Sequence, residues 1–232
     1  MRKFCIYLLS AFLFLLVGCG KKTILQNPVF LLQYNIDTSS YSGYAEYKSS
    51  GSNFQLRPVP SVVFSNNPAA DSVNFLFQSQ LQDVSGSPVA MFVVSKRFAK
   101  SQCDSTVLNW TLKSDYDFYS IFKTGEIKMR YSDGTGLRDG LNLSLTTSTA
   151  DYHLPLSLAA YNDTTYRFEI SEIAYYATDN DIDWNKLISD NIVELGSRRI
   201  MVKFNFRCKL YDVSNDSTLV TNGVFQSVFT DR

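Results

Sequence analysis

The sequence is short of the residues that enzymes most often use for acid–base and metal chemistry. It contains one histidine, His153, and four cysteines. A single histidine excludes the usual zinc sites, which need several His or Cys ligands, and no Gly-x-Ser-x-Gly elbow accompanies it. Cys-x-x-Cys pairs, phosphate-binding loops and dinucleotide-binding glycine patterns are also missing. The sequence therefore shows no recognisable catalytic set and does not favour an enzyme.

The sequence also lacks an excess of charge of either sign. Lysine and arginine together number 22, as do aspartate and glutamate. No basic stripe runs through the chain, so the electrostatic footprint of a nucleic-acid-binding protein is missing. Apolar residues make up 45% and aromatic residues 14% of the chain, which is enough for a sizeable core.

Long hydrophobic runs are missing except at the start of the chain. Arg2 and Lys3 precede an almost wholly apolar stretch over residues 4–17, and small Gly18 follows it. This order of a basic start, an apolar run and a small residue is typical of a secretory signal peptide. The run is shorter than the roughly 20 residues that a membrane-spanning helix needs. We therefore expect residues 1–18 to be removed.

The end of this segment indicates a lipid anchor. Leu16, Val17 and Gly18 lead directly into Cys19, a pattern that resembles the lipobox of bacterial lipoproteins. The resemblance implies that Cys19 carries acyl chains and becomes the N-terminus. Because several acyl chains anchor a protein stably, we expect residence in the outer membrane, at its periplasmic face or on the cell surface. Residues 19–27 then form a lipidated tether.

Two cysteines remain beyond the tether, Cys103 and Cys208. In an oxidising compartment, two cysteines can form a disulfide. Their settings differ, since Cys103 lies in a polar stretch and Cys208 alternates in phase with apolar residues of a strand. The sequence therefore leaves two hypotheses open: a bridge, or a loop thiol at 103 with a buried thiol at 208.

From residue 28 onward the sequence is typical of an all-β protein. Alternating apolar residues predict half-buried strands, and turn residues separate them. The clearest alternations are Val73, Phe75, Phe77 and Leu81; Leu141, Leu143 and Leu145; and Val202, Phe204, Phe206, Cys208 and Leu210. We predict one antiparallel β-sandwich over 28–232, Ig-like or jelly-roll-like. A seam near 113–122 would divide it if it had two lobes.

One short helix is predicted near 183–194. Asp183 is a suitable cap for its start. Trp184, Leu187 and Ile192 then fall on one helical face, and Gly196 follows the predicted end.

An acidic stretch in front of this helix is the only candidate metal site. Asp179, Asp181 and Asp183 alternate, and Asp190 falls at the twelfth place, as in a calcium-binding loop. Trp184 stands where such a loop has glycine, and the twelfth residue is Asp instead of Glu. The pattern therefore supports Ca²⁺ only weakly, and otherwise no cofactor is expected. The alternative is an acidic loop that caps the helix.

Aromatic and carboxylate residues provide the remaining candidate sites. Tyr41, Tyr44 and Tyr47 are spaced as a platform on which a sugar or other ligand could stack, although tyrosines in strands usually pack across the sheet. Glu169 and Glu172 are three residues apart on a predicted strand, which points them to opposite faces. They therefore do not form the carboxylate pair that glycoside hydrolysis needs.

The end of the chain is similar to that of a group of uncharacterised Bacteroidota lipoproteins. The resemblance lies in the segment 206–211, which reads Phe-Arg-Cys-Lys-Leu-Tyr, and in Thr221, Asn222, Gly223 and Phe225 after a polar turn. It implies a secreted β-sandwich and no assigned activity.

These observations favour a lipid-anchored β-sandwich of the cell envelope. It would act as a binding or accessory module for a glycan, a peptide or an envelope partner, with no nucleic acid involved. A glycan-active enzyme that uses Asp and Glu is one alternative, and a structural or pilus-like subunit is another.

Overall fold

The structure is a computed structural model that describes residues 29–36, 38–46, 53–54, 56–66, 70–106, 109–132, 138–175 and 184–232. The predicted signal segment 1–18 and tether 19–27 lie outside these residues, and Cys19 lies there with them.

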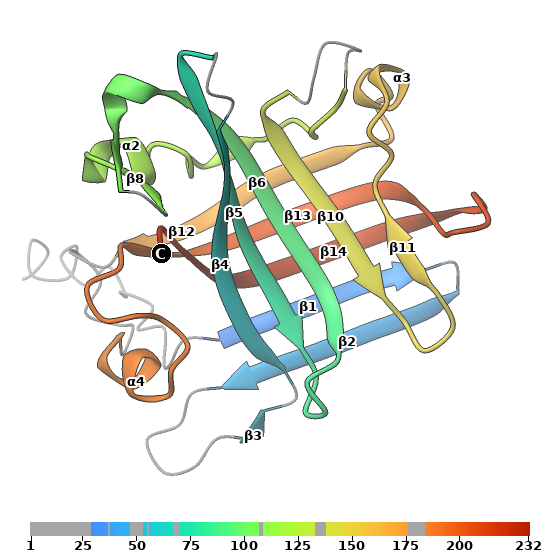
Figure 1. The fold of residues 1–232 in the computed structure, drawn as a ribbon. Helices are drawn as coiled ribbons and strands as arrows, with labels where there is room; N and C mark the ends of the chain where they lie inside the picture. The colour runs from blue at the N-terminus through green and yellow to red at the C-terminus, as the bar shows by residue number, and fades with distance from the viewer. Residues whose placement is uncertain are drawn as a thin grey trace, which may run out of the picture.

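The strands form one large antiparallel sheet and one small sheet (Figure 1). The large sheet has 12 strands in the order β3-β2-β1-β14-β13-β11-β10-β6-β5-β4, and β12 and β9 branch from β13. The small sheet pairs β7 with β8. The first nine strands are β1 (Val29–Ile36), β2 (Ser39–Glu46), β3 (Asn53–Phe54), β4 (Arg57–Asn66), β5 (Ser72–Gln82), β6 (Pro88–Ala99), β7 (Cys103–Ser105), β8 (Trp110–Leu112) and β9 (Gly125–Glu126). The others are β10 (Gly140–Thr146), β11 (Asp151–His153), β12 (Arg167–Tyr175), β13 (Arg199–Tyr211) and β14 (Ser217–Thr230).

The large sheet curls so that two parts of it face each other. Strands β4, β5, β6 and β10 form a front layer, and β12, β13, β14, β1 and β2 form a back layer whose strands cross the front ones steeply (Figure 1). Short β11 joins β10 to β13 at one side, and β4 lies beside β14 at the other. The prediction of an antiparallel β-sandwich is confirmed, with both layers supplied by one continuous sheet.

The alternating strands bury the residues that their pattern predicts. Along β5, buried and half-buried residues alternate without interruption, and Leu141, Leu143 and Leu145 of β10 are fully buried. Cys208 is fully buried on the core face of β13. Period-2 alternation turns every second side chain toward the other layer, which is why these strands could be read from the sequence.

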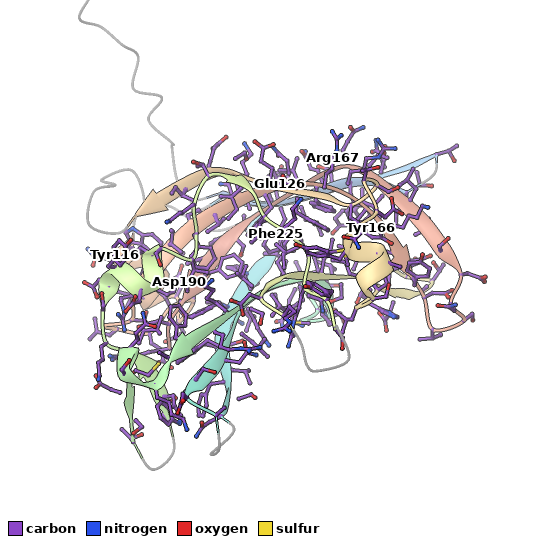
Figure 2. The ribbon with its side chains drawn as sticks, turned by 90° about the horizontal axis from the view of Figure 1, so that it is seen from above. Tyr116, Glu126, Tyr166, Arg167, Asp190 and Phe225 are labelled. Atoms are coloured by element: carbon purple, nitrogen blue, oxygen red, sulfur yellow. The ribbon has the colours of Figure 1, made fainter. Side chains whose placement is uncertain are left out.

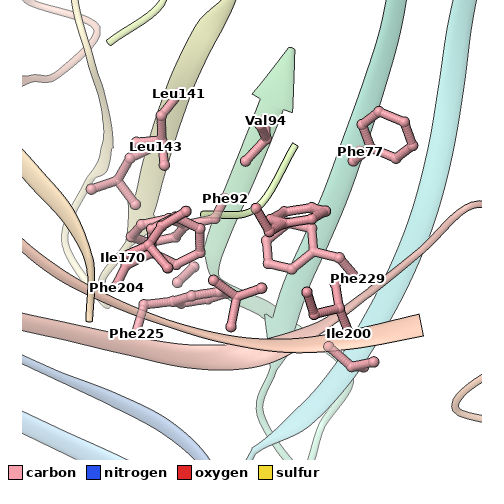
Figure 3. Packing of buried hydrophobic residues seen from close by; sticks show 14 of the residues in the cluster. Phe77, Phe92, Val94, Leu141, Leu143, Ile170, Ile200, Phe204, Phe225 and Phe229 are labelled. Carbon is pink, nitrogen blue, oxygen red and sulfur yellow. The ribbon is translucent and has the colours of Figure 1, made fainter. Parts of the chain in front are cut away.

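Phenylalanine rings fill the space between the layers (Figure 3). Phe92 of the front layer stacks on Phe225 of the back layer with ring centroids 4.0 Å apart, and Phe204 lies 5.2 Å from Phe92. These rings remove large apolar areas from water and add the preference of aromatic pairs for stacked or edge contacts. One polar contact crosses the same core: the hydroxyl groups of Ser79 and Ser227, both fully buried, are 2.7 Å apart.

The segment 113–122 belongs to this core. It contains the helix α2 (Asp115–Tyr119), and Phe118 and Phe122 are fully buried. The ring of Phe118 lies 5.7 Å from that of Phe77, and the ring of Phe122 lies 5.0 Å from that of Phe229. Phe118 lies in α2, and Phe122 follows in the turn after it, where the Phe122 amide donates to the Tyr119 carbonyl. No seam divides the described residues here.

The other helices are α3 (Leu158–Tyr161) and α4 (Trp184–Ser189), and a 3-10 turn covers Lys100–Gln102. α4 confirms the predicted helix but ends five residues early. Asn191 takes a positive φ of 55°, and the Ile192 amide donates to the carbonyl of Leu187. A left-handed residue closes the last turn in this way, and glycine is not required for it when asparagine is present.

Candidate functional site

A groove of about 1150 Å³ lies on the solvent side of the back layer. Its floor consists of outward residues of β12, β13 and β14, and its walls are the segment 126–129 and the chain from α3 to β12. We call this feature the outer groove. Figure 2 shows Glu126 and Arg167 on the outer side of the back layer, while Phe225 lies on the opposite side of this layer, between the sheets.

The floor holds two directly opposed pairs of polar side chains. Arg167 of β12 is the register partner of Arg207 of β13, and Glu169 is the partner of Asn205. All four are exposed. Partners in an antiparallel ladder have Cβ atoms about 5 Å apart, so each pair meets on one face. Within the described residues, none of the four side chains makes a hydrogen bond or an ion pair.

A β-bulge shapes the middle of the floor. Phe206 pairs with Gly223 and Cys208 with Val220, so β14 holds one residue more than β13 over this interval. Asn222 absorbs the extra residue with a φ of 52° and is exposed in the groove. The bulge also displaces the pairing of β14 with β1 on its other side. Bulges bend a strand and redirect a side chain, and here the redirected side chain is an amide.

The charged side chains on the walls form ion pairs or hydrogen bonds with neighbouring groups. Lys128 forms an ion pair with Glu126. The carboxylate of Asp163 accepts a 2.8 Å hydrogen bond from the Thr165 amide, and this bond lowers the pKa of Asp163, as nearby Lys209 also does.

Tyrosines line the end of the groove near α3. Tyr161 packs on Tyr131 with ring centroids 4.3 Å apart. Burial raises the pKa of Tyr166 above its usual range, and a hydrogen bond to Tyr211 raises it further. Both Tyr161 and Tyr166 are half-buried, so each leaves part of its ring accessible from the groove.

The predicted tyrosine platform does not form on β2. Tyr41 is half-buried and stacks on Tyr34 with ring centroids 5.1 Å apart, whereas Tyr44 is 44% exposed. Residues three apart in a strand point to opposite faces, so the two rings do not share a surface. Tyr47 lies outside the described residues. The accessible tyrosines of the outer groove come instead from the ends of α3 and β12.

The predicted calcium site lies mostly outside the described residues. Asp179, Asp181 and Asp183 lie outside the described residues, and Asp190 lies in the turn after α4. Where the structure is described, no group of three or more His, Cys, Asp or Glu is placed to hold a metal ion.

Cys103 and Cys208 are both buried and both free, so the bridge that the sequence left open is not formed. Cys103 starts β7 in the small sheet and Cys208 lies in the middle of β13. Burial raises the pKa of both thiols. The expectation of a loop thiol at 103 is wrong, because Cys103 is buried at the first position of β7. The Cys103 thiol is 3.5 Å from the Ala99 carbonyl.

Glu169 and Glu172 are both exposed, contrary to the prediction of opposite faces. A bulge between Ile170 and Glu172 adds one residue to β12 and restores the outward direction at 172. Glu172 forms an ion pair with Lys203 at 2.7 Å.

The segment 127–131 has alternating apolar residues, a pattern typical of a strand. It is instead an irregular bridge between the layers. The Ile127 amide donates to the Phe168 carbonyl, and the Arg130 amide donates to the Leu141 carbonyl. Met129 and Arg130 are both buried, which breaks the alternation. This bridge forms one wall of the outer groove.

No family model, no curated protein and no solved structure matches this chain. Across the described part of the chain, none of the helices is both long and apolar enough to span a membrane.

Proposed function

We propose that this protein is a lipid-anchored binding module of the bacterial cell envelope that takes saccharide chains into the outer groove. The observation that carries this proposal is a set of exposed polar side chains on the floor that have no hydrogen-bond or ion-pair partner among the described residues: Arg167, Glu169, Asn205, Arg207 and Asn222. Guanidinium, amide and carboxylate groups together donate to and accept from hydroxyl groups, and half-buried tyrosines offer apolar ring surface beside them.

The anchor part of the proposal is supported by the sequence around Cys19. A basic start, an apolar run and a small residue directly before a cysteine give the order that lipid modification needs. A tether after Cys19 would leave the sandwich free to reach saccharides near the membrane.

The binding part is tested with the full chain, purified in detergent and applied to a panel of immobilised saccharides. We expect retention on at least one saccharide class. The variant Asn222→Ala should weaken retention several-fold, because it removes an amide from the centre of the floor. The matched control is Asn66→Ala, an exposed asparagine at the end of β4 in the front layer. Equal retention of the two variants would contradict the assignment of the groove.

The side of the membrane is tested by treating intact cells with protease, with lysed cells as the control. Digestion in intact cells means that the domain is displayed on the surface. Survival until lysis means that it faces the periplasm, and binding partners are then sought among envelope glycans and proteins.

A glycan-active enzyme is the second candidate, favoured by one contact. Glu126 of β9 is the register partner of Glu169 in β12, so two carboxylates stand opposite each other in the groove. Paired carboxylates are the usual machinery of glycoside hydrolysis. Turnover of a retained saccharide that is lost in Glu169→Gln, with retention kept, would identify an enzyme.

A further inference from the structure

We infer that the outer groove selects anionic saccharides, with Arg167 and Arg207 as a two-arginine subsite for a carboxylate or sulfate group on the sugar. This inference rests on the proposed function and adds the chemical class of the ligand. It starts from the register of β12 and β13, which places the two arginines directly opposite each other on the exposed face.

Two like charges in this relation destabilise a sheet. A carboxylate at one of the two positions would stabilise the pairing instead, as Glu172 does against Lys203 four pairs along the same ladder. No carboxylate of the described residues forms an ion pair with either Arg167 or Arg207. The repulsion between them is therefore left for a bound anion to relieve.

The floor of the groove carries more positive than negative charge, since Arg167 and Arg207 stand there against Glu169, two residues from Arg167 on the same strand. On the walls, Glu126 forms an ion pair with Lys128. The carboxylate of Asp163 stays ionised, because the Thr165 amide and nearby Lys209 lower its pKa. The lining as a whole is therefore neutral, and the positive charge is concentrated at the arginine pair.

Arginine suits this task because its planar guanidinium donates two parallel hydrogen bonds to a carboxylate or sulfate. Two guanidinium groups on neighbouring strands can hold one anion from both sides. Asn205 and Asn222 lie next to Arg207 on β13 and β14 and can bind the hydroxyl groups of the same sugar. The neutral amides thus favour a saccharide over a simple anion.

The test measures binding of the detergent-purified full chain to four probes by calorimetry. The probes are oligogalacturonate, sulfated galacto-oligosaccharide, the neutral galacto-oligosaccharide of equal length, and poly-glutamate. We expect one of the two anionic saccharides to bind at least tenfold more tightly than the neutral one, and its identity shows whether carboxylate or sulfate is the natural group.

The variants Arg167→Gln and Arg207→Gln should each weaken binding of the preferred anionic saccharide at least tenfold and weaken binding of the neutral saccharide far less, because glutamine still offers a hydrogen-bond donor but no positive charge. Arg167→Lys should keep only part of the preference, because it preserves the charge but loses the paired donors. The matched control is Arg57→Gln, an exposed arginine on β4 in the front layer, which should behave as wild type.

The outcomes distinguish a failure of the anion subsite from a failure of the saccharide groove. Equal binding of anionic and neutral saccharides, unchanged by the arginine variants, would overturn the anion subsite and keep the saccharide groove. Binding of no saccharide would overturn both. Binding of poly-glutamate alone would likewise overturn both and identify an acidic peptide as the ligand.

Discussion

Position 223 requires glycine because the ring of Phe206, its register partner in β13, fills the space that a side chain would need. A Cβ atom at 223 would lie 2.4 Å from Cε2 of that ring, which is closer than atoms can pack. Phe206 is itself held by Phe92 and Phe168, so it cannot move aside. The glycine lets the bulged strand approach β13 while Asn222 turns outward.

The substitution Gly223→Ala should lower the free energy of unfolding by about 2–3 kcal/mol, because an overpacked site must shift rings or backbone. Urea denaturation measures this loss. In Phe206→Leu the smaller side chain leaves room, so the added cost of Gly223→Ala in that background should be much smaller. Equal costs in both backgrounds would show that the ring contact is not the cause.

Tyr34 makes stability depend on alkaline pH. Burial, and then the neighbouring Tyr41, raise the pKa of Tyr34 to about 12, above its usual value of about 10. The folded state therefore prefers the protonated phenol, and this preference stabilises the protein fully below pH 10 and is lost as the pH rises through about 12.

We accordingly expect the free energy of unfolding to decline between about pH 10 and 12, and Tyr34→Phe to flatten the decline. Urea denaturation at a series of pH values measures it. Tyr44→Phe, at an exposed position on the paired strand β2, should leave the decline in place. A decline that is the same in Tyr34→Phe as in wild type would contradict this role.

At the scale of single residues, the sequence predicts which side chains are buried better than it predicts which residues pair across neighbouring strands. Alternation along 202–210 places Phe206 and Cys208 inward and Arg207 outward, and the structure agrees. That Arg207 meets Arg167 depends on register across some forty residues, which one sequence does not reveal. The bulges at 171 and 222 shift that register further.

The end of β14 is tied to the start of β13 by an ion pair. The backbone amide of Arg198 donates to Oδ1 of Asp231 at 2.7 Å, and its Nε donates to Oδ2 at 2.5 Å. The same guanidinium donates to the Leu112 carbonyl in β8 and reaches Asp115 at 3.4 Å. One arginine thus joins β14 to the small sheet and to α2.

Asp231→Asn should destabilise the protein by about 3 kcal/mol, because it leaves a largely buried guanidinium without its charge partner. The side chain of Asp231 is 2% exposed, whereas that of Asp115 is 80% exposed. Asp115→Asn is therefore the matched control, with an expected loss under about 1 kcal/mol. Thermal unfolding compares the two variants, and similar losses would contradict the importance of burial.

At the scale of elements, the sequence predicts those strands that pack against the core with one face only. β5 and β10 alternate throughout, β13 alternates from Val202 onward, and all three have the core faces that the pattern predicts. α2 was missed because five residues are too few for a helical period, and the bridge at 127–131 imitates a strand. The outer groove depends on that bridge and on two bulges, so its shape could not be inferred from patterns.

At the scale of the whole molecule, we predict that Cys19 carries acyl chains. We expect the full chain to enter the detergent phase in a detergent phase-separation assay, and its N-terminal peptide to carry acyl mass. Cys19→Ser should move the protein to the aqueous phase, because the acyl chains supply the membrane affinity. Cys5→Ser, a substitution in the segment 1–18 that we expect to be removed, should change neither result. Cys19→Ser protein that stays in the detergent phase would refute the anchor.

The position of β14 between β1 and β13 has a consequence for how the protein is made. Synthesis proceeds from the N-terminus, so β1 and β13 emerge before the 14-residue strand that pairs with both. Until that strand arrives, each has an open edge and an uncovered apolar face, a combination that invites aggregation. Nascent copies of the chain must therefore be kept from contacting one another until β14 is complete. A premature stop before residue 217 should yield an insoluble product instead of a smaller domain.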